Sequence, residues 1–267
     1  MDNDLKGKVA LVTGGNGTLG QEHCEALLEC GAIVYSADIN LIKNNRFDQF
    51  KSYNQIHLDV TSENSVRTTL SKVLKYEKAI NILINNAAID SKVQNKTVTE
   101  DFSRLENFTL EQWNNELNVG LTGAFLCSKY FGNHFAQNGG GVILNIASDL
   151  SVISPDQRLY YNKDISNINQ QPVKPVTYSV IKAALIGLTK YLSTYWPEGI
   201  VRVNALSPGG VFIDQPIEFV QKIENLIPLG RMAKKDEYKS AIQFLCSNAS
   251  QYMTGQNMIM DGGRSVW

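Results

Sequence analysis

The chain has 267 residues, of which 43% are hydrophobic and 19% are charged, and its formal net charge is -1. A chain of this size and composition can bury a complete core, so we expect one domain over residues 1–267. The near-neutral charge and the lack of a basic run argue against nucleic acid or a membrane surface as a partner and favour a small molecule. No apolar run is long enough for a signal peptide or a membrane span, which predicts a cytoplasmic protein.

The cysteines and histidines are scattered along the chain. No CxxC spacing occurs, and the cysteines fall within helical patterns, where a thiol mostly acts as a small hydrophobe. We therefore expect a reducing environment, no disulfide framework and no metal site. The residues concerned are Cys24, Cys30, Cys127, Cys246, His23, His57 and His134.

Short apolar, β-branched runs alternate with helical patterns from one end of the chain to the other. This alternation predicts an α/β fold, a single-domain Rossmann-type doubly wound parallel sheet of about seven strands with helices on both faces. A three-to-four spacing of apolar residues predicts one long helix over 110–136, and a second follows over 176–195. The expected strands cover residues 8–12, 32–37, 55–60, 80–85, 141–147, 200–206 and 256–260.

Two connections, residues 89–108 and 149–176, are longer than is usual in a compact domain. Loops of more than about 12 to 15 residues are commonly functional or disordered. The second is rich in Asn, Gln, Asp and Pro, and we interpret it as an insertion that serves as a substrate lid.

The first expected strand runs directly into a glycine cluster, VALVTGGNGTLG at residues 9–20. Gly15, Gly17 and Gly20 fit the G-x-G-x-x-G spacing of a dinucleotide-binding turn, although a glycine-rich loop or hairpin would look the same. A Walker loop is excluded because no Gly-Lys-Ser/Thr follows.

The second expected strand ends at Asp38, about 20 residues after the glycine cluster. A carboxylate at that position suits the ribose hydroxyls of a dinucleotide whose pyrophosphate rests on the helix N-terminus. It would repel a 2′-phosphate by roughly 4 kcal/mol per unit charge at about 4 Å and an effective dielectric near 20. The pattern therefore favours NAD over NADP, the alternative being that Asp38 only caps a turn.

Several motifs in order resemble the short-chain dehydrogenase/reductase superfamily, of the single-domain kind. They are TGGNGTLG at 13–20, LDV at 58–60, NNAA at 85–88, NVGLTG at 118–123, NIAS at 145–148, YSVIK at 178–182, NALSPGG at 204–210 and TGQNMIMDGG at 254–263. The resemblance implies a catalytic tetrad of Asn118, Ser148, Tyr178 and Lys182. It also implies that Asp59 and Val60 hold the adenine. The full predicted cofactor set is Gly14, Asn16, Gly17, Thr18, Leu19, Gly20, Asp38, Ile39, Asp59, Val60, Asn86, Ala87, Ala88, Tyr178, Lys182, Pro208, Gly209 and Val211.

The residue types suit these roles. Tyr178 and Lys182 are four residues apart, which places both side chains on one helix face. Tyrosine alone is a poor base, but a neighbouring cation favours the phenolate. Ser148 can hydrogen-bond a substrate oxygen, and Asn118 is suited to holding a water that links Lys182 to solvent.

Two positions depart from the pattern of the family. Thr18 stands where a glycine is common, and Ile213 stands where a threonine often follows Pro208 by five residues. The loss of that hydroxyl predicts looser cofactor binding. The glycine spacing also fits larger sugar-nucleotide-modifying relatives, but the chain is too short for their substrate domain.

The insertion and the ending MDGGRSVW are similar to oxidoreductases of bacterial surface-glycan and flagellin-modification pathways. We expect Arg158 and Lys174 to read an anionic group of the substrate. The amides Asn162, Asn167, Asn169, Gln170 and Gln171 would meet sugar hydroxyls. The alternative is a surface loop whose charges are only solvated.

The combined hypothesis is an NAD(H)-dependent oxidoreductase that moves a hydride between nicotinamide and a secondary alcohol or ketone of a polar, sugar-derived substrate, either phosphorylated or nucleotide-linked. One alternative is a ketoacyl-type reductase using NADP, and another is a catalytically silent dinucleotide-binding regulator. The apolar surface of the helix over 110–136 and the small residues Ala183, Ala184 and Gly187 predict a homo-oligomer, a tetramer with two-fold symmetry.

Overall fold

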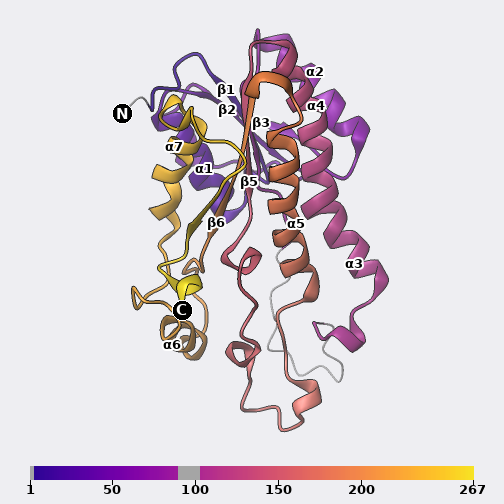
Figure 1. Cartoon of the computed structure of the whole chain (residues 1–267), viewed down its shortest axis with the longest axis vertical. Coiled ribbons are helices and arrows are strands. Elements are labelled where there is room, and N and C mark those ends of the chain that lie inside the picture. The colour runs from indigo at the N-terminus through magenta and orange to yellow at the C-terminus, as the bar shows by residue number, and fades with distance from the viewer. Residues whose placement is uncertain (1–2, 90–102) are drawn as a thin grey trace.

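The computed structural model describes residues 3–89 and 103–267. Its core is a parallel seven-stranded sheet with the order β3-β2-β1-β4-β5-β6-β7 (Figure 1). The expected doubly wound parallel fold is thereby confirmed. The strands are β1 (Val9–Thr13), β2 (Ile33–Asp38), β3 (Tyr53–His57), β4 (Ile82–Asn85), β5 (Gly141–Ile146), β6 (Val201–Pro208) and β7 (Asn257–Met260).

Helices cover both faces of the sheet (Figure 1). On one face α1 and α7 pack together over a buried cluster that contains Leu27, Ile84 and Ile242. On the other, α2 and α4 cover a cluster around Leu83 and Phe131. The helices are α1 (Thr18–Glu29), α2 (Glu63–Tyr76), α3 (Leu110–Leu117), α4 (Gly123–Gln137), α5 (Val176–Ser193), α6 (Ile217–Glu224) and α7 (Lys239–Cys246). None of the helices in the described ranges could cross a membrane, given their lengths and polarity.

The order in which strands are added reverses between β1 and β4, because the chain returns from β3 at one edge to place β4 beside β1. β1 pairs with β2 on one side and with β4 on the other, with Ala10 opposite both Val34 and Ile82. In such sheets the connections that follow neighbouring strands diverge at this point and leave a crevice beyond the carboxyl ends of the strands. All five residues of β1 are buried, which its apolar sequence VALVT explains.

Two expected elements differ from those in the structure. The strand expected over 55–60 ends at His57, because the Asp59 carboxylate accepts a hydrogen bond from the Thr61 backbone and forms a turn. The helix expected over 110–136 is interrupted by a π-helical turn, η3 (Asn118–Thr122). This turn packs closely: a Cβ at Gly120 would lie 2.8 Å from the Ile181 side chain of α5.

The insertion over 149–176 contains short 3-10 turns between extended segments: η4 (Asp149–Ser151), η5 (Gln157–Tyr160) and η6 (Ile168–Gln170). It packs against α6, where Leu159 joins a buried cluster with Val220 and Ile223. Figure 1 shows it at the same end of the molecule as α6. Most of the other long connection, residues 90–102, lies outside the described residues.

Candidate active site

A cavity of about 760 Å³ opens beyond the carboxyl ends of β1, β4, β5 and β6. Its lining comes from the glycine turn, the ends of the central strands, the start of α5 and the insertion. This is where a doubly wound sheet binds its ligand. The volume suits a ligand of cofactor size.

The glycine turn is closed so tightly that side chains would not fit. Gly14 has φ +61, and a Cβ there would lie 2.9 Å from Ala87 Cα. A Cβ at Gly20 would lie 2.1 Å from the Gly14 carbonyl oxygen. The turn leads into α1, and Gly17, the N-cap residue before Thr18, provides no side-chain cap. The first amides of this 12-residue helix therefore face the cavity, an arrangement that suits a pyrophosphate.

Asn86 fixes the position of the glycine turn against β4. Its side-chain amide donates to the carbonyl oxygens of Thr13 and Gly14, each at 3.0 Å. The Thr13 hydroxyl in turn accepts from the backbone of Asn86 and Ala87 at 3.0 Å. Asn86 thus both holds the glycine turn and lines the cavity.

Asp38 ends β2 at the rim of the cavity. One carboxylate oxygen accepts from the Asn16 backbone at 3.1 Å and the other from the Asn40 backbone at 3.0 Å. The Asn16 amide also donates to the Asn40 carbonyl oxygen at 2.5 Å. Asn16 therefore ties the glycine turn to the carboxylate, although it does not belong to the cavity lining itself.

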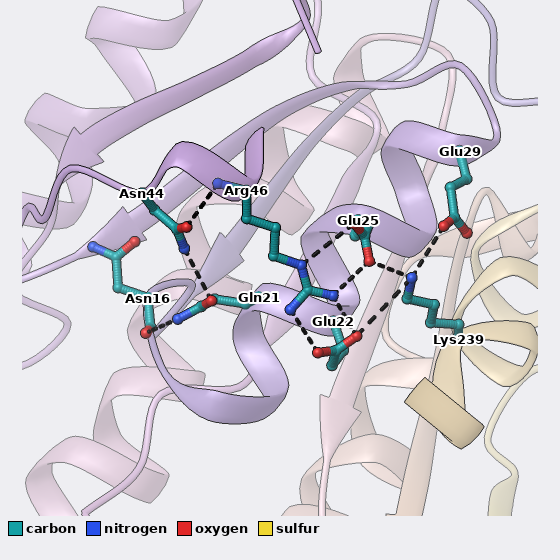
Figure 2. A network of polar contacts seen from close by, with 8 residues as sticks. All are labelled: Asn16, Gln21, Glu22, Glu25, Glu29, Asn44, Arg46 and Lys239. Carbon is teal, nitrogen blue, oxygen red and sulfur yellow. Dashed lines mark hydrogen bonds and ion pairs between the residues drawn. The ribbon is translucent and has the colours of Figure 1, made fainter. Parts of the chain in front are cut away.

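A polar network behind this rim occupies the one arginine of the segment that follows β2 (Figure 2). Arg46 donates to both carboxylate oxygens of Glu22 at 2.6 Å and to Glu25 at 2.5 Å and 3.3 Å. Hydrogen bonding to Arg46 is the main cause that lowers the pKa of Glu25 to about 2. Lys239 of α7 lies on the far side of Glu25 (Figure 2).

The network also reaches the glycine turn. The Asn44 amide donates to Gln21 at 2.9 Å, and the Gln21 amide donates to the Asn16 carbonyl oxygen at 2.8 Å (Figure 2). Asn44 accepts from the Arg46 backbone at 3.1 Å. The Arg46 guanidinium itself donates to two glutamates of α1 and not to the Asp38 carboxylate.

Three of the four predicted catalytic residues line the inner end of the cavity: Ser148, Tyr178 and Lys182. Tyr178 and Lys182 lie one turn apart on α5, with the Lys182 ammonium 5.7 Å from the Tyr178 ring centre. That ammonium donates to the Ile146 carbonyl oxygen of β5 at 2.8 Å. Ser148 is buried directly after β5. The arrangement places a phenol, a hydroxyl and a cation around one space.

Asn118 takes a different position. It begins the π-helical turn η3, it is exposed, and it is outside the cavity lining. The neighbouring Val119 lines the cavity, and Gly120 of the same turn packs on Ile181, the residue next to Lys182. π-helical turns are frequent at functional sites. The predicted role of Asn118 in a proton path stays a prediction.

Of the two cations in the insertion that were expected to face the substrate, one lines the cavity and the other does not. Lys174 lines the cavity, and its ammonium lies 3.9 Å from the Tyr178 ring centre. Arg158 is outside the lining: its side chain is 88% exposed and donates to Asp156 at 2.7 and 2.8 Å. Tyr160, which the sequence analysis did not assign, lines the cavity instead.

The amides of the insertion also differ from the expectation, because the side chains of Asn162, Asn167 and Gln171 make hydrogen bonds within the loop itself. The Gln171 amide donates to the carbonyl oxygens of Asn162 and Ile165, and its side-chain oxygen accepts from the Asn162 backbone at 2.8 Å. Asn167 accepts from the backbone two residues further on. None of the five amides is among the cavity-lining residues, and three of them, Asn162, Asn167 and Gln171, stabilise the loop.

All the predicted cofactor residues except Asn16 line the cavity. One part of the cavity wall, formed by residues of the second half of the chain, was not predicted from the sequence. Phe219, Ile223 and Met232 make an apolar side, and Asp149 and Arg264 meet next to Ser148. These residues reach the cavity because α6 packs against the insertion and the turn at Arg264 meets Asp149, and no local sequence motif predicts either contact.

Comparison with known proteins agrees with this geometry. A family model described as short chain dehydrogenase matches residues 8–162, and one described as enoyl-(acyl carrier protein) reductase matches residues 165–265. A short chain dehydrogenase from Leptospira borgpetersenii, solved with bound NAD+, is 32% identical. It superimposes with a TM-score of 0.84 over 98% of this chain and 94% of its own.

Two similar proteins are named by both cofactor and substrate. An NAD-dependent glycerol dehydrogenase of Listeria innocua is 28% identical over 99% of this chain and 96% of its own length. An NADP-dependent mannitol dehydrogenase of Alternaria alternata is 30% identical over 98% of this chain and 94% of its own length. The two names differ in the nicotinamide cofactor and agree on a polyol.

Proposed function

Because the chain belongs to the short-chain dehydrogenase family, whose model matches residues 8–162, we propose that it is an NAD(H)-dependent oxidoreductase acting on a polar, sugar-derived alcohol or ketone. The observation that carries the proposal is the meeting of Ser148, Tyr178 and Lys182 in one cavity that also reaches Asp38. Nicotinamide bound there supplies or accepts the hydride. The phosphorylated or nucleotide-linked form of the substrate is part of the same proposal.

The protein's own residues handle the proton and the substrate oxygen. The Tyr178 phenol gives a proton to that oxygen during reduction and takes it during oxidation. The Lys182 ammonium, held by the Ile146 carbonyl, favours the ionised phenol through its charge. The Ser148 hydroxyl holds the substrate oxygen in place. Asn118 completes the proposed path for the proton to solvent.

A preference for NAD rests on the charges at the adenosine end. Asp38 places a carboxylate at the rim, no lysine or arginine of the segment after β2 is among the lining residues, and the guanidinium of Arg46 is held by Glu22 and Glu25. A 2′-phosphate would therefore meet negative charge without a compensating cation. Ile213 lines the cavity and brings no hydroxyl to the cofactor, which supports the prediction of weaker cofactor binding.

The substrate end of the cavity combines a cation with an apolar wall. Lys174 can attract a phosphate or carboxylate, while Phe219, Ile223 and Met232 can pack against the carbon face of a sugar. The polyol names of similar proteins agree with this class. The insertion over 149–176 acts in this proposal as the lid, and the link to surface-glycan pathways stays a prediction.

The decisive experiment follows NADH absorbance in stopped flow while a panel of polyols, sugar phosphates and nucleotide sugars is presented. Turnover by the parent and its loss in Tyr178→Phe would support the proposal. NADH binding without turnover of any sugar by the parent would instead support a dinucleotide-binding regulator. A strong preference for NADPH and for a ketoacyl thioester substrate would support the hypothesis of a ketoacyl-type reductase.

We also propose that the chain assembles as a homotetramer through α4 and α5. Phe125 on α4 and Val180, Ala183 and Tyr191 on α5 are exposed, and a Cβ at Gly187 would meet no atom within 4 Å. An exposed apolar face with small residues suits a close, self-complementary helix contact. Light scattering that gives a monomer at micromolar concentration would contradict this assembly.

A further inference from the structure

A buried ion pair joins the residue after Ser148 to a distant part of the chain. Arg264 donates to a carboxylate oxygen of Asp149 at 2.8 Å, and the two side chains are only 8% and 5% exposed. Arg264 belongs to the 3-10 turn η10 (Arg264–Val266), and both residues line the cavity. The pair therefore lies beside the proposed catalytic residues.

The two oxygens of Asp149 have separate partners. The oxygen that does not face Arg264 accepts from the Ser148 hydroxyl at 2.8 Å and from the Leu150 backbone at 2.9 Å. The Ser148 oxygen itself accepts from the Leu150 backbone at 3.2 Å. The guanidinium thus fixes the orientation of the carboxylate, and the carboxylate fixes the hydroxyl.

This arrangement decides what Ser148 offers to the cavity. A serine hydroxyl has one proton and two acceptor positions. In the structure the proton is directed to Asp149 and one acceptor position is used by Leu150. A substrate alcohol has one O–H proton, which the proposed reaction gives to Tyr178, so Ser148 must turn its own proton from Asp149 toward the substrate oxygen in order to hold it.

The charge of Arg264 is needed for this state. A buried carboxylate without a partner is strongly unfavourable, and it responds by moving, taking up water or binding a proton. Each response would change the hydrogen bond to Ser148. The position of Arg264 is itself well defined, because the Asp261 carboxylate accepts from the Gly263 and Ser265 backbone on either side of it.

We propose that Arg264 is a positioning residue that acts through Asp149 to hold the Ser148 hydroxyl in place beside the substrate oxygen. The proposal rests on the oxidoreductase function proposed above. The segment around Arg264 would then contribute to catalysis through its ion pair with Asp149.

The test is a double-mutant cycle with Ser148 on the NAD-dependent oxidation of mannitol and glycerol as probe alcohols. Arg264→Met should lower kcat about tenfold or more and leave the Kd of NADH within about threefold. In a Ser148→Ala background the same change should have less than about a twofold effect. Arg264→Lys should recover part of the rate, and Arg231→Met, a change at an exposed arginine outside the cavity, should have none. Equal effects of Arg264→Met in both backgrounds would overturn the proposal.

A crystal structure of the Arg264→Met protein with NADH gives a readout that does not depend on turnover. The Ser148 oxygen or the Asp149 carboxylate should rotate away from the position seen in the parent. An unchanged Ser148–Asp149 hydrogen bond would refute the positioning role. If the parent neither binds NADH nor oxidises any alcohol, the proposed function is refuted instead. The Ser148–Asp149 hydrogen bond can still be compared between the parent and Arg264→Met in that case.

Discussion

The ammonium of Lys182 lies 5.7 Å from the centre of the Tyr178 ring and is held there by a 2.8 Å hydrogen bond to the Ile146 carbonyl oxygen. The cation is thus near the phenol but anchored to β5. In the proposed function Tyr178 acts on the substrate oxygen alone. Lys182 supports both the ionised phenol and the binding of the cofactor.

Replacing the phenol should separate chemistry from binding. We expect Tyr178→Phe to lower kcat about a hundredfold or more, because a positioned proton donor contributes that much, and to leave the Kd of NADH nearly unchanged. Lys182→Ala should impair both. Tyr76→Phe is a matched control, since Tyr76 is 81% exposed. Activity of Tyr178→Phe within tenfold of the parent would contradict the assignment.

Cofactor choice should depend on Asp38. We expect the parent to bind NADH at least tenfold more tightly than NADPH, a difference of only about 1.4 kcal/mol. Asp38→Ala should narrow this ratio by improving NADPH binding, measured by fluorescence titration. Asp236→Ala, at an exposed carboxylate, should leave the ratio unchanged. Equal affinity of the parent for both cofactors would rule out the proposed preference.

The two cations of the insertion should behave differently. Lys174 lines the cavity and Arg158 is paired with Asp156 outside it. We expect Lys174→Glu to raise the KM for an anionic sugar substrate about ten- to a hundredfold, because a charge-assisted bond is worth roughly 1.5 to 3 kcal/mol. Arg158→Glu is the matched variant and should leave KM unchanged. A larger effect of Arg158→Glu would restore the original expectation for that residue.

The network around Arg46 should matter for both stability and cofactor binding. Arg46→Met removes one of the two cations beside Glu22 and Glu25, the other being Lys239, which should cost about 1 to 3 kcal/mol of unfolding free energy because Arg46 is partly exposed. Denaturant unfolding would measure this loss. The link to the glycine turn runs through the Arg46 backbone and the Asn44 side chain, so Asn44→Ala, rather than Arg46→Met, should raise the Kd of NADH. Arg67→Met, at an exposed position on α2, should change neither quantity.

His23 should make the protein less stable in mild acid. Burial lowers the pKa of His23 to about 3, and neither ring nitrogen has a hydrogen-bond partner among the described residues. Below pH 6.5 the unfolded chain binds a proton that the folded chain excludes, so stability falls as the pH decreases toward about 3. Between pH 7.5 and 5.0 the loss from this one group is about 2 kcal/mol.

His23→Leu should reduce that pH dependence, because the replacement has no proton to bind. At pH 7.5 the variant should be at least as stable as the parent, since it removes a buried polar group without partners. His57→Gln, at an exposed histidine, serves as the control. Identical pH dependence of the parent and His23→Leu would show that His23 does not contribute.

The sequence by itself determined the fold and most of the cofactor site, because both depend on local patterns. Apolar runs of strand length, a glycine turn and a carboxylate about 20 residues later have a mechanical meaning that needs no knowledge of distant contacts. The four-residue spacing of Tyr178 and Lys182 likewise placed both on one helix face. The tertiary structure then brought Ser148 to them.

Other features were decided only by tertiary packing. The sequence could not show which of Lys174 and Arg158 lines the cavity, because the direction of each side chain depends on the fold of the loop. Arg158 is held outside the cavity by its ion pair with Asp156. The polar amides of the insertion looked suited to a sugar, yet Gln171 uses its amide to satisfy backbone carbonyls of its own loop. The pairing of Asp149 with Arg264 joins residues 115 positions apart. Such a contact follows from how η4 and η10 meet, since a long-range ion pair has no period or spacing in the sequence.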